Sequence, residues 1–384
     1  MTCPYAEICG GCLRRGMSEE QYRETKTAAF RRILSGIKAD FAFGKPVFVA
    51  DGTRRRWGKP SRRAAMAFRR RKGKVTLGFN EAASGNVVDC ETCALLTPKL
   101  NAALPDVRRL LTEVCALPFT ERKKGRKTVP VFLDGGDVWL CEADNGTDVV
   151  LEFDRPLELG HRMAVFELAQ GFDGIIRISH RRRPDAEAEP VVEKNAPYVK
   201  IADTFVYIPA GTFLQPSREG EQALVTLVLK YLGETSGRIA DLFCGVGTFS
   251  YPLARNPANR VLAVDSSERL LEGFRRTVNK NMIPNIEIAA KNLFKYPLDD
   301  AELKGFNAVV FDPPRAGAAA QTARLAALPV GERPEKIIAV SCNPGTFVND
   351  ANTLVSAGYK LVEVTMVDQF VYSDHSELVA LFTK

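Results

Sequence analysis

Cys342 has the setting of a reactive thiol. It stands in the run Ser341-Cys342-Asn343-Pro344, which ends one apolar segment and starts a helical one. A thiol close to a helix N-terminus has a lowered pKa, so more of it is present as the thiolate, the form that attacks carbon. A buried structural cysteine is the alternative interpretation. The neighbours of Cys342 favour a nucleophile.

A candidate proton acceptor lies near the C-terminus, in the run Asp374-His375-Ser376-Glu377. Glu377 opens the final apolar strand, so we expect it at the same edge of the sheet as the thiol. A carboxylate within hydrogen-bond reach of a substrate can take up a proton from it. His375 is one of three histidines in the chain, and we assign it a supporting role.

A glycine turn could bind a nucleotide-like cofactor. The run Asp241-Leu-Phe-Cys-Gly245-Val-Gly247-Thr248 ends a β-type segment, and its glycines let the backbone turn tightly against a ligand. The third glycine of the dinucleotide fingerprint is missing, which argues against a nicotinamide cofactor. Asp265 ends the next apolar segment, where a carboxylate can accept both hydroxyls of a ribose. The alternative is a purely structural turn.

A fourth motif, Asp312-Pro313-Pro314-Arg315, ends a later apolar segment. Two consecutive prolines stiffen the loop and fix the position of Asp312. A Rossmann-like methyltransferase meets its acceptor base at this place. Because the motif comes after the glycine turn and Asp265 in the expected order, it favours methyl transfer.

The elements that must position these residues begin at about residue 201, where short apolar segments alternate with amphipathic helical ones. A helix is expected over 267–281. Strands are expected over 238–243, 260–264, 286–289, 308–311, 337–340 and 361–367. This alternation predicts a mostly parallel, doubly wound α/β sheet, which binds ligands at the carboxyl ends of its strands.

The first 200 residues show a different pattern. It predicts a short Cys-rich head, a helix near 19–36 and a β-rich segment. Two hairpins are expected in the β-rich segment, the first around Lys72-Gly73 and the second around Gly135-Gly136. The first would join 64–68 to 74–79, and the second would join 129–133 to 138–142. The polar, proline-bearing stretch 181–197 is predicted to be a linker or long loop.

Bulk properties are those of an ordinary globular protein of two or three domains, with 384 residues, 45% hydrophobic and 26% charged. No apolar run approaches the length of a membrane span, so no membrane partner is expected. The N-terminus lacks the apolar core of a secretory signal, which favours a cytoplasmic location. No feature indicates an obligate protein partner.

Charge is concentrated in the front half of the chain. Residues 1–200 hold 35 Lys and Arg against 26 Asp and Glu, whereas residues 201–384 hold 18 against 20. Residues 54–74 alone hold eleven basic residues and no acidic one, with Trp57 and Phe68 interleaved. This composition suits single-stranded or looped RNA, whose bases can stack on aromatic rings. Phe68 is equally compatible with a core position.

Cysteines gather at the front of the chain. The nine cysteines include a first group, Cys3, Cys9 and Cys12, and a second group, Cys90 and Cys93. Without a secretory signal these groups indicate a metal site rather than disulfides. The two C-x2-C pairs by themselves are typical of a four-cysteine zinc site.

Five segments together resemble the RNA 5-methyluridine methyltransferase family, the bacterial uracil-C5 methyltransferases of tRNA and 23S ribosomal RNA. They are FLQPS at 213–217, DLFCGVGTF at 241–249, DPPRAG at 312–317, SCNPGT at 341–346 and DQFVYSDHSE at 368–377. The chain departs from the family pattern at Ser217, where Asn is common. It departs again at 371–373, where a Pro-His-Thr or Pro-Tyr-Thr run is more usual.

The resemblance implies a Rossmann-like class I methyltransferase domain over 201–384. Ahead of it, it implies a Cys-rich metal-binding head over 1–40 and a β-rich central RNA-binding domain over 41–200. The similarity is greatest to the iron–sulfur branch that acts on 23S rRNA. The extra N-terminal barrel domain of that branch is not expected here, which leaves RNA recognition to the central region.

The resemblance also implies the chemistry. Cys342 would add to C6 of a uracil, which makes C5 electron-rich enough to accept a methyl group from S-adenosylmethionine, and Glu377 would then remove the C5 proton. The cofactor pocket would be lined by Gln215, Phe243, Gly245, Thr248, Asp265, Asn292 and Asp312. A [4Fe-4S] cluster would bind Cys3, Cys9, Cys12 and Cys93. The additional Cys90 keeps zinc open as the metal.

Other functions are weighed against this one. An RNA 5-methylcytosine methyltransferase usually carries a second Cys in the proline loop, where this chain has Asp312-Pro-Pro. An amino-methylating enzyme is expected to have an aromatic residue after the two prolines, and here it is Arg315. A uridine methyltransferase of tRNA, and a noncatalytic RNA-binding or ribosome-assembly factor, remain as alternatives.

Overall fold

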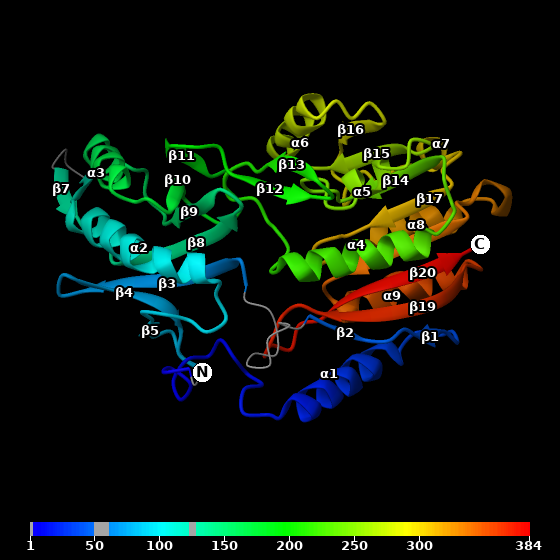
Figure 1. The fold of residues 1–384 in the computed structure, drawn as a ribbon, viewed down its shortest axis with the longest axis horizontal. Coiled ribbons are helices and arrows are strands. Elements are labelled where there is room, and N and C mark those ends of the chain that lie inside the picture. Colours follow the sequence, from blue (N-terminus) through cyan, green and yellow to red (C-terminus); the bar gives the residue numbers. More distant parts are fainter. Residues whose placement is uncertain (1–2, 50–60, 123–127) are drawn as a thin grey trace. The chain divides into compact units, whose positions relative to one another are not determined.

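The computed structural model describes residues 3–49, 61–122 and 128–384, which fold into two compact units (Figure 1). The β-rich unit comprises residues 3–15, 61–122, 128–199 and 208–214. The parallel-sheet unit comprises residues 16–49, 200–207 and 215–384. In these described ranges no helix is long and apolar enough to cross a membrane.

The parallel-sheet unit is built on one large sheet with strand order β1-β19-β20-β18-β17-β14-β15-β16, and β2 also pairs with β19. Its strands are β1 (Ala42–Phe43), β2 (Val47–Phe48), β14 (Arg238–Leu242), β15 (Arg260–Asp265), β16 (Ile286–Ala290), β17 (Ala308–Phe311), β18 (Lys336–Ser341), β19 (Lys360–Asp368) and β20 (Glu377–Thr383). Strands β14 to β18 run parallel, and β20 runs antiparallel between β18 and β19. The predicted strands of this sheet are confirmed to within two residues.

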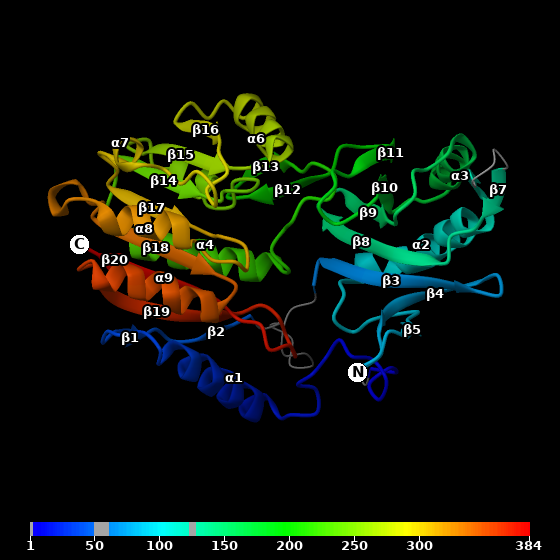
Figure 2. The same cartoon turned by 180° about the vertical axis from the view of Figure 1, so that it is seen from behind.

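Helices cover both faces of this sheet, as a doubly wound fold requires. They are α1 (Glu19–Leu34), α4 (Arg218–Leu232), α5 (Ser250–Ala254), α6 (Glu268–Lys280), α7 (Asp300–Leu303), α8 (Ala319–Ala327), the 3-10 turn η1 (Val330–Glu332) and α9 (Pro344–Ser356). One face packs against α1, α7, α8 and α9 through a shared apolar core. Helix α4 lies over the other face, in front in Figure 1 and behind in Figure 2.

The β-rich unit has a seven-stranded sheet of order β11-β10-β9-β8-β3-β4-β5. Its strands are β3 (Arg63–Arg71), β4 (Lys74–Asn80), β5 (Val87–Asp89), β8 (Gly135–Ala143), β9 (Gly146–Glu152), β10 (Ile175–Arg181) and β11 (Glu189–Glu193). Helices α2 (Pro98–Ala116) and α3 (Leu159–Gln170) share a core with one face of the sheet. The predicted β3–β4 hairpin is confirmed, and Phe68 is fully buried in that core.

The second predicted hairpin is wrong. Strand β7 (Thr128–Val131) pairs with β6 (Phe119–Arg122) and not with β8. Gly135 and Gly136 do not form a turn, because they open β8, which pairs with β3 and β9. A Cβ on Gly136 would lie 2.4 Å from the carbonyl oxygen of Glu152, so these glycines allow close strand approach.

The linker predicted over 181–197 is also wrong in part. Arg181 ends β10, and residues 189–193 form β11, which pairs antiparallel with β10. Only residues 182–188 and 194–197 lie outside strands. Strands β12 (Tyr198–Ile201) and β13 (Thr204–Tyr207) then pair as a separate two-stranded ribbon.

Helix α1 packs in the parallel-sheet unit, so the compact units divide the chain differently from the expected ranges 1–40 and 41–200. A buried polar cluster holds it there. Lys26 Nζ donates to Asp368 Oδ1 at 2.5 Å and to the carbonyl oxygen of Phe370, and the Tyr22 hydroxyl donates to Asp368 Oδ2 at 2.7 Å. Lys26 and Asp368 are each 2% exposed. Helix α1 thereby anchors the segment that leads from β19 to Glu377.

We expect Lys26→Met to lower the free energy of unfolding by about 3 kcal/mol, because it leaves the Asp368 carboxylate buried without its cation. Urea denaturation measures the change. Lys304→Met, which removes one partner of the exposed Lys304–Glu332 ion pair, is the matched control and should change stability by less than about 1 kcal/mol. Equal losses in the two variants would contradict the anchoring role.

Candidate active site

The four sequence motifs of the parallel-sheet unit come together because their strands are parallel. Strands β14, β15, β17 and β18 end at Leu242, Asp265, Phe311 and Ser341. The carboxyl ends of parallel strands meet at one edge of a sheet. The glycine turn, Asp265, the proline loop and Cys342 therefore share that edge.

The glycine turn has the backbone conformation that a close ligand requires. Phe243, Gly245 and Gly247 have φ angles of 61°, 55° and 93°. A Cβ on Gly245 would meet no atom within 4 Å, so the space beside its Cα is open. Gly247 is different, because a Cβ there would lie 2.7 Å from the ring of Phe274. Gly245 thus leaves room for a ligand, whereas Gly247 is required by packing.

Asp265 closes the same turn from the neighbouring strand. Its Oδ2 accepts a hydrogen bond from the backbone N–H of Gly245 at 3.0 Å, and its Oδ1 accepts one from Ser267 N at 2.9 Å. Two backbone donors fix the carboxylate, and each oxygen retains a lone pair for a ribose hydroxyl. Thr248 follows directly in the turn that leads into α5.

An aromatic pair flanks the turn. The rings of Phe243 and Phe294 lie 5.3 Å apart, centroid to centroid, and Phe294 is 45% exposed. Asn292 accepts hydrogen bonds from the backbone N–H groups of Phe294 and Lys295, which fixes this loop. Phe243 and Asn292 were predicted from the sequence, but Phe294 was not, because its only signal was its position two residues after Asn292. The pair, the open space at Gly245 and Asp265 fit the adenosine part of S-adenosylmethionine.

Cys342 and Glu377 are brought together by strand register. Strand β20 pairs antiparallel with β18, and Ser341 lies opposite Leu378. Cys342 and Glu377, the next residues outward on the two strands, therefore meet at the edge that carries the cofactor turn. Asn343 caps α9 by accepting from Gly345 N, so the thiol precedes a helix N-terminus as predicted.

The thiol pKa differs from the prediction. Burial, together with Glu377 and Asp312, raises the pKa of Cys342 to about 11, and Arg315 opposes this rise. The predicted lowering of the thiol pKa by the helix N-terminus is wrong, because desolvation and two carboxyl groups outweigh it. Thiolate formation is therefore coupled to the protonation of its neighbours.

The neighbouring carboxyl groups are also perturbed. Burial raises the pKa of Glu377 to about 8, with Asp312 as the next cause, and burial raises the pKa of Asp312 to about 7. Asp241, fully buried behind the turn, likewise has its pKa raised to about 7 by burial. Groups with pKa values near neutrality can exchange protons during a reaction.

A chain of buried amides links these carboxyl groups. Gln369 Nε2 donates to Gln215 Oε1 at 2.7 Å and to Glu377 Oε1 at 3.4 Å, and Gln215 Nε2 lies 3.5 Å from Asp312 Oδ2. Glu377 Oε2 has no hydrogen-bond partner among the described residues. Gln369 was not among the predicted site residues, although it lies in the segment 368–377 that carried the family resemblance.

His375 lies against Arg315 and not against the thiol. Arg315 Nη2 is 2.8 Å from His375 Nε2. Burial, with Arg315 and Lys26, lowers the pKa of His375, so it is neutral at pH 7. Its place beside Arg315, the cation that lowers the pKa of both Cys342 and Glu377, gives it a supporting position. Ser217, the departure from the family pattern, caps α4 by accepting from Gly220 N.

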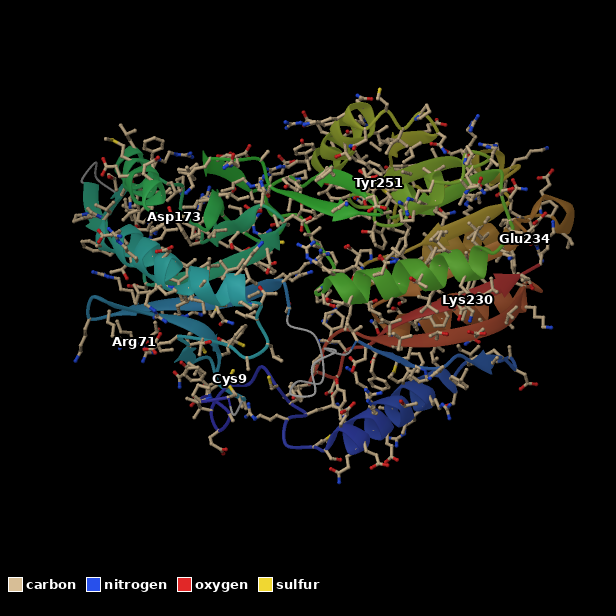
Figure 3. All side chains as sticks on the ribbon, in the orientation of Figure 1. Cys9, Arg71, Asp173, Lys230, Glu234 and Tyr251 are labelled. Carbon is tan, nitrogen blue, oxygen red and sulfur yellow. The ribbon has the colours of Figure 1, made fainter. Side chains whose placement is uncertain are left out.

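The cysteines of the front segments belong to the β-rich unit, where Figure 3 marks Cys9, and they act electrostatically on one another. Burial raises the pKa of Cys12 to about 11, and Cys93, Cys9 and Cys3 raise it further in that order. Burial likewise raises the pKa of Cys90 to about 11. Among the described residues, no three His, Cys, Asp or Glu side chains are arranged to hold a metal ion.

These features define a class of protein, an enzyme with a methyltransferase fold that sets a thiol and a carboxyl group beside its cofactor turn. A family model described as tRNA (uracil-5-)-methyltransferase matches residues 189–384. The chain belongs to this family of S-adenosylmethionine-dependent enzymes and is an RNA (uracil-C5)-methyltransferase. The resemblance noted in the sequence is thus confirmed.

Relatives agree with this assignment. An uncharacterized RNA methyltransferase of Caulobacter vibrioides is 35% identical over 100% of this chain and 86% of its own length. A 23S rRNA (uracil(1939)-C(5))-methyltransferase, RlmD, of Pectobacterium atrosepticum is 30% identical over 99% of this chain and 79% of its own. The crystal structure of Pyrococcus abyssi tRNA (uracil-54, C5)-methyltransferase with S-adenosyl-L-homocysteine has the same fold. Its TM-score is 0.68, with 24% identity over 98% of this chain and 85% of that one.

We expect stability to depend on pH through Glu377. Its pKa rises from 4.5 to about 8 in the folded protein, so the folded state binds this proton more tightly than the unfolded state. The stability that the proton contributes is complete below about pH 4.5 and is lost as the pH rises toward 8. Glu377→Gln has no such titrating group. The Tm of this variant relative to that of wild type should therefore rise between pH 5 and about 8. A constant Tm difference in thermal denaturation across this range would contradict the raised pKa.

Proposed function

We propose that this enzyme methylates C5 of a uridine in 23S rRNA through a covalent bond between Cys342 and C6 of the uracil. The observation that carries the proposal is the β18–β20 register, which sets Cys342 beside Glu377 at the edge of the cofactor turn. Both groups are needed in that place, because C5 of uracil is a poor nucleophile until a thiolate has added to C6.

Each proton has a residue to take it. Asp312, as the carboxylate, accepts the thiol proton of Cys342, whose pKa is raised to about 11, and Glu377 remains available for the later step. The thiolate adds to C6, and the electron pair moves onto the uracil as an enolate. C5 then attacks the methyl group, the S–CH3 bond breaks, and its electron pair stays on the departing sulfur, which becomes a neutral thioether. Glu377 removes the C5 proton, and the electrons of that C–H bond expel the Cys342 thiolate and restore the C5–C6 double bond.

S-Adenosylmethionine, when bound, supplies the electrophilic methyl group. We assign its binding to the residues at the sheet edge named from the sequence: Gln215, Phe243, Gly245, Thr248, Asp265, Asn292 and Asp312. Phe294 joins them through its contact with Phe243. Asp265 would accept the ribose hydroxyls, and Gly245 would leave the space for close approach.

Ribosomal RNA is favoured over tRNA by two observations. The RlmD proteins of Pectobacterium atrosepticum and Enterobacter are 30% and 28% identical to this chain, each over 99% of its length. The second observation is the group of cysteines at the front of the chain, which resembles the head of the iron–sulfur branch that acts on 23S rRNA. A tRNA substrate is the alternative, supported by the description of the family model.

Methylation of separated RNAs with labelled S-adenosylmethionine tests the proposal. RNA from a strain that lacks the enzyme should take up label as 5-methyluridine in 23S rRNA. Cys342→Ala should lower the rate of methylation at least about 1000-fold, because no other residue supplies the thiolate that makes C5 nucleophilic. Label in tRNA would favour the alternative substrate. Label on another base, or label that persists without Cys342, would overturn the mechanism.

We propose further that Cys3, Cys9, Cys12 and Cys93 bind a [4Fe-4S] cluster. The chemistry of the donor set supports this, because burial and then the neighbouring thiols raise the pKa of Cys12 and Cys93. A bound metal would stabilise the thiolate forms. The side chains as they stand do not form a metal-sized site, so the thiols would have to move together on binding. Zinc, with Cys90 in the set, is the alternative.

Iron and acid-labile sulfide in protein purified without oxygen test the cluster. We expect about four of each per chain, with a broad visible absorption that Cys93→Ser abolishes. Cys115→Ser is the matched control, because Cys115 is fully buried in the apolar core and has no part in the head. Zinc at one per chain without iron would favour the alternative, and no metal in either form would contradict the site.

We propose that the β-rich unit binds RNA, with Arg69, Arg70 and Arg71 of the β3–β4 hairpin as phosphate contacts. Figure 3 marks Arg71. Arg70 stacks on Phe132, whose ring centroid is 5.0 Å from Cζ and which is 40% exposed. Phe68 is buried and can take no part in base stacking. The candidate stacking residue Trp57 lies outside the described residues.

Replacing Arg69, Arg70 and Arg71 by Ala should weaken binding to rRNA by more than about tenfold at moderate salt. The slope of log affinity against log salt should fall by up to about 2, because each lost phosphate contact to single-stranded RNA lowers it by about 0.7. Binding measured across a salt series gives both quantities. An unchanged slope would contradict a role for the hairpin in binding phosphate.

A further inference from the structure

A pocket opens on the face of the β-rich sheet that α2 and α3 do not cover. Side chains alternate along a strand, so Met66 and Leu140 face the core under the helices while Arg63 and Trp139 face the other side. The pocket has a volume of about 210 Å³. Its lining includes Arg63, Trp139, Cys141, Asp148, Arg181 and Phe213. All of these residues belong to the β-rich unit.

Arg63 brings a cation to this pocket without an acid to balance it. Its Nη1 donates to the carbonyl oxygen of Leu214 at 3.0 Å, and its Cζ lies 4.0 Å from the ring centroid of Phe213. Among the described residues it forms no ion pair with a carboxylate. Burial lowers the pKa of the guanidinium, and the charge of Arg62 adds to this effect. A guanidinium in such a setting is stabilised by an anion.

The other charges of the pocket are already paired. Arg177 Nη2 and Nε each donate to Asp148 at 2.8 Å, in a bidentate pair in which both side chains are buried. Arg181 Nε donates to Glu152 at 2.6 Å. The net charge that remains toward the pocket is therefore the positive charge of Arg63.

Trp139 gives the pocket a rigid aromatic wall. Its Nε1 donates to Glu152 Oε2 at 3.0 Å, and Cζ of Arg181 lies 4.9 Å from its ring centroid. A fixed indole beside an unbalanced guanidinium matches the two halves of a nucleotide, because single-stranded RNA binds through base stacking and phosphate contacts. The pocket is too small for a duplex and suits one unstacked base.

We propose that this pocket binds one nucleotide of the RNA substrate other than the target uridine, with its phosphate on Arg63 and its base against Trp139. The proposal rests on the proposed function only in that RNA is the substrate. It adds a binding site that is distinct from the thiol and its carboxyl neighbours, and distinct from the β3–β4 hairpin tip. Such a site would select RNA that presents an unpaired nucleotide in addition to the target.

A ten-nucleotide oligoadenylate is a suitable probe, because it contains no uridine and therefore reports binding without methyl transfer. The chain has two tryptophans, Trp57 and Trp139, so Trp57→Phe leaves Trp139 as the only tryptophan fluorophore. In this background we expect a saturable change in emission. Arg63→Met should weaken binding about tenfold and lower the slope of log affinity against log salt by about 0.7, the loss of one phosphate contact.

Arg183→Met is the matched control, because Arg183 is an exposed arginine of the same unit, paired with Asp185, outside the pocket. It should keep the wild-type slope. Arg63→Lys keeps the cation and should also keep the slope, which covers the case in which Arg63→Met fails to fold. No change in Trp139 emission at saturating oligonucleotide would overturn the proposal, and so would a folded Arg63→Met with the wild-type slope. Oligoadenylate binding does not depend on methyl transfer by Cys342. A failure of the proposed methylation and a failure of the proposed nucleotide pocket can therefore be told apart.

Discussion

The position of β20 is the constraint on which the active site depends. Parallel strands end at one edge of the sheet and bring the glycine turn, Asp265, Asp312 and Cys342 there. A residue at the start of a strand can reach the same edge only if that strand runs antiparallel to the others. Strand β20 is antiparallel to β18 and begins at Glu377, so the carboxyl side chain of Glu377 lies beside the thiol of Cys342. A shift of this register by one residue would turn Glu377 to the other face of the sheet. The segment ahead of β20 is held in turn by Lys26 through Asp368 and Phe370.

Desolvation sets the chemistry of this edge. Burial raises the pKa values of Cys342, Asp312, Glu377 and Asp241 together, and each negative charge disfavours the next. The thiol is therefore mostly neutral near pH 7, whereas Asp312 and Glu377, with pKa values of about 7 and 8, titrate close to that pH. Proton exchange between the thiol and a carboxylate, with Arg315 as the nearby cation, is consistent with a mechanism in which one group must lose a proton and another must accept one.

Much of the parallel-sheet unit could be predicted from the sequence, because its strands are continuous apolar runs that end in recognisable motifs. The order of the motifs fixed the sheet edge, and the opening of the last strand placed Glu377 on it. Long-range pairing defeated the prediction elsewhere. The Gly135-Gly136 pair opens a strand because β3 and β9 are its neighbours, and residues 189–193 form a strand because β10 lies beside them. Helix α1 packs in the parallel-sheet unit through a buried contact between Lys26 and Asp368, which are far apart in the chain. The pKa of Cys342 depends on burial, which local sequence does not reveal.

In the proposed mechanism, Cys342 bonds to the base and Glu377 then removes the C5 proton. Glu377→Gln can complete the bond and the methyl transfer but cannot take up that proton. After incubation with S-adenosylmethionine and unmodified 23S rRNA, followed by denaturation, mass spectrometry of nuclease-treated protein should find a methylated uridine nucleotide on Cys342. The double variant with Cys342→Ala should show none. Full methylation by Glu377→Gln at the wild-type rate, with no protein–RNA adduct, would contradict the account.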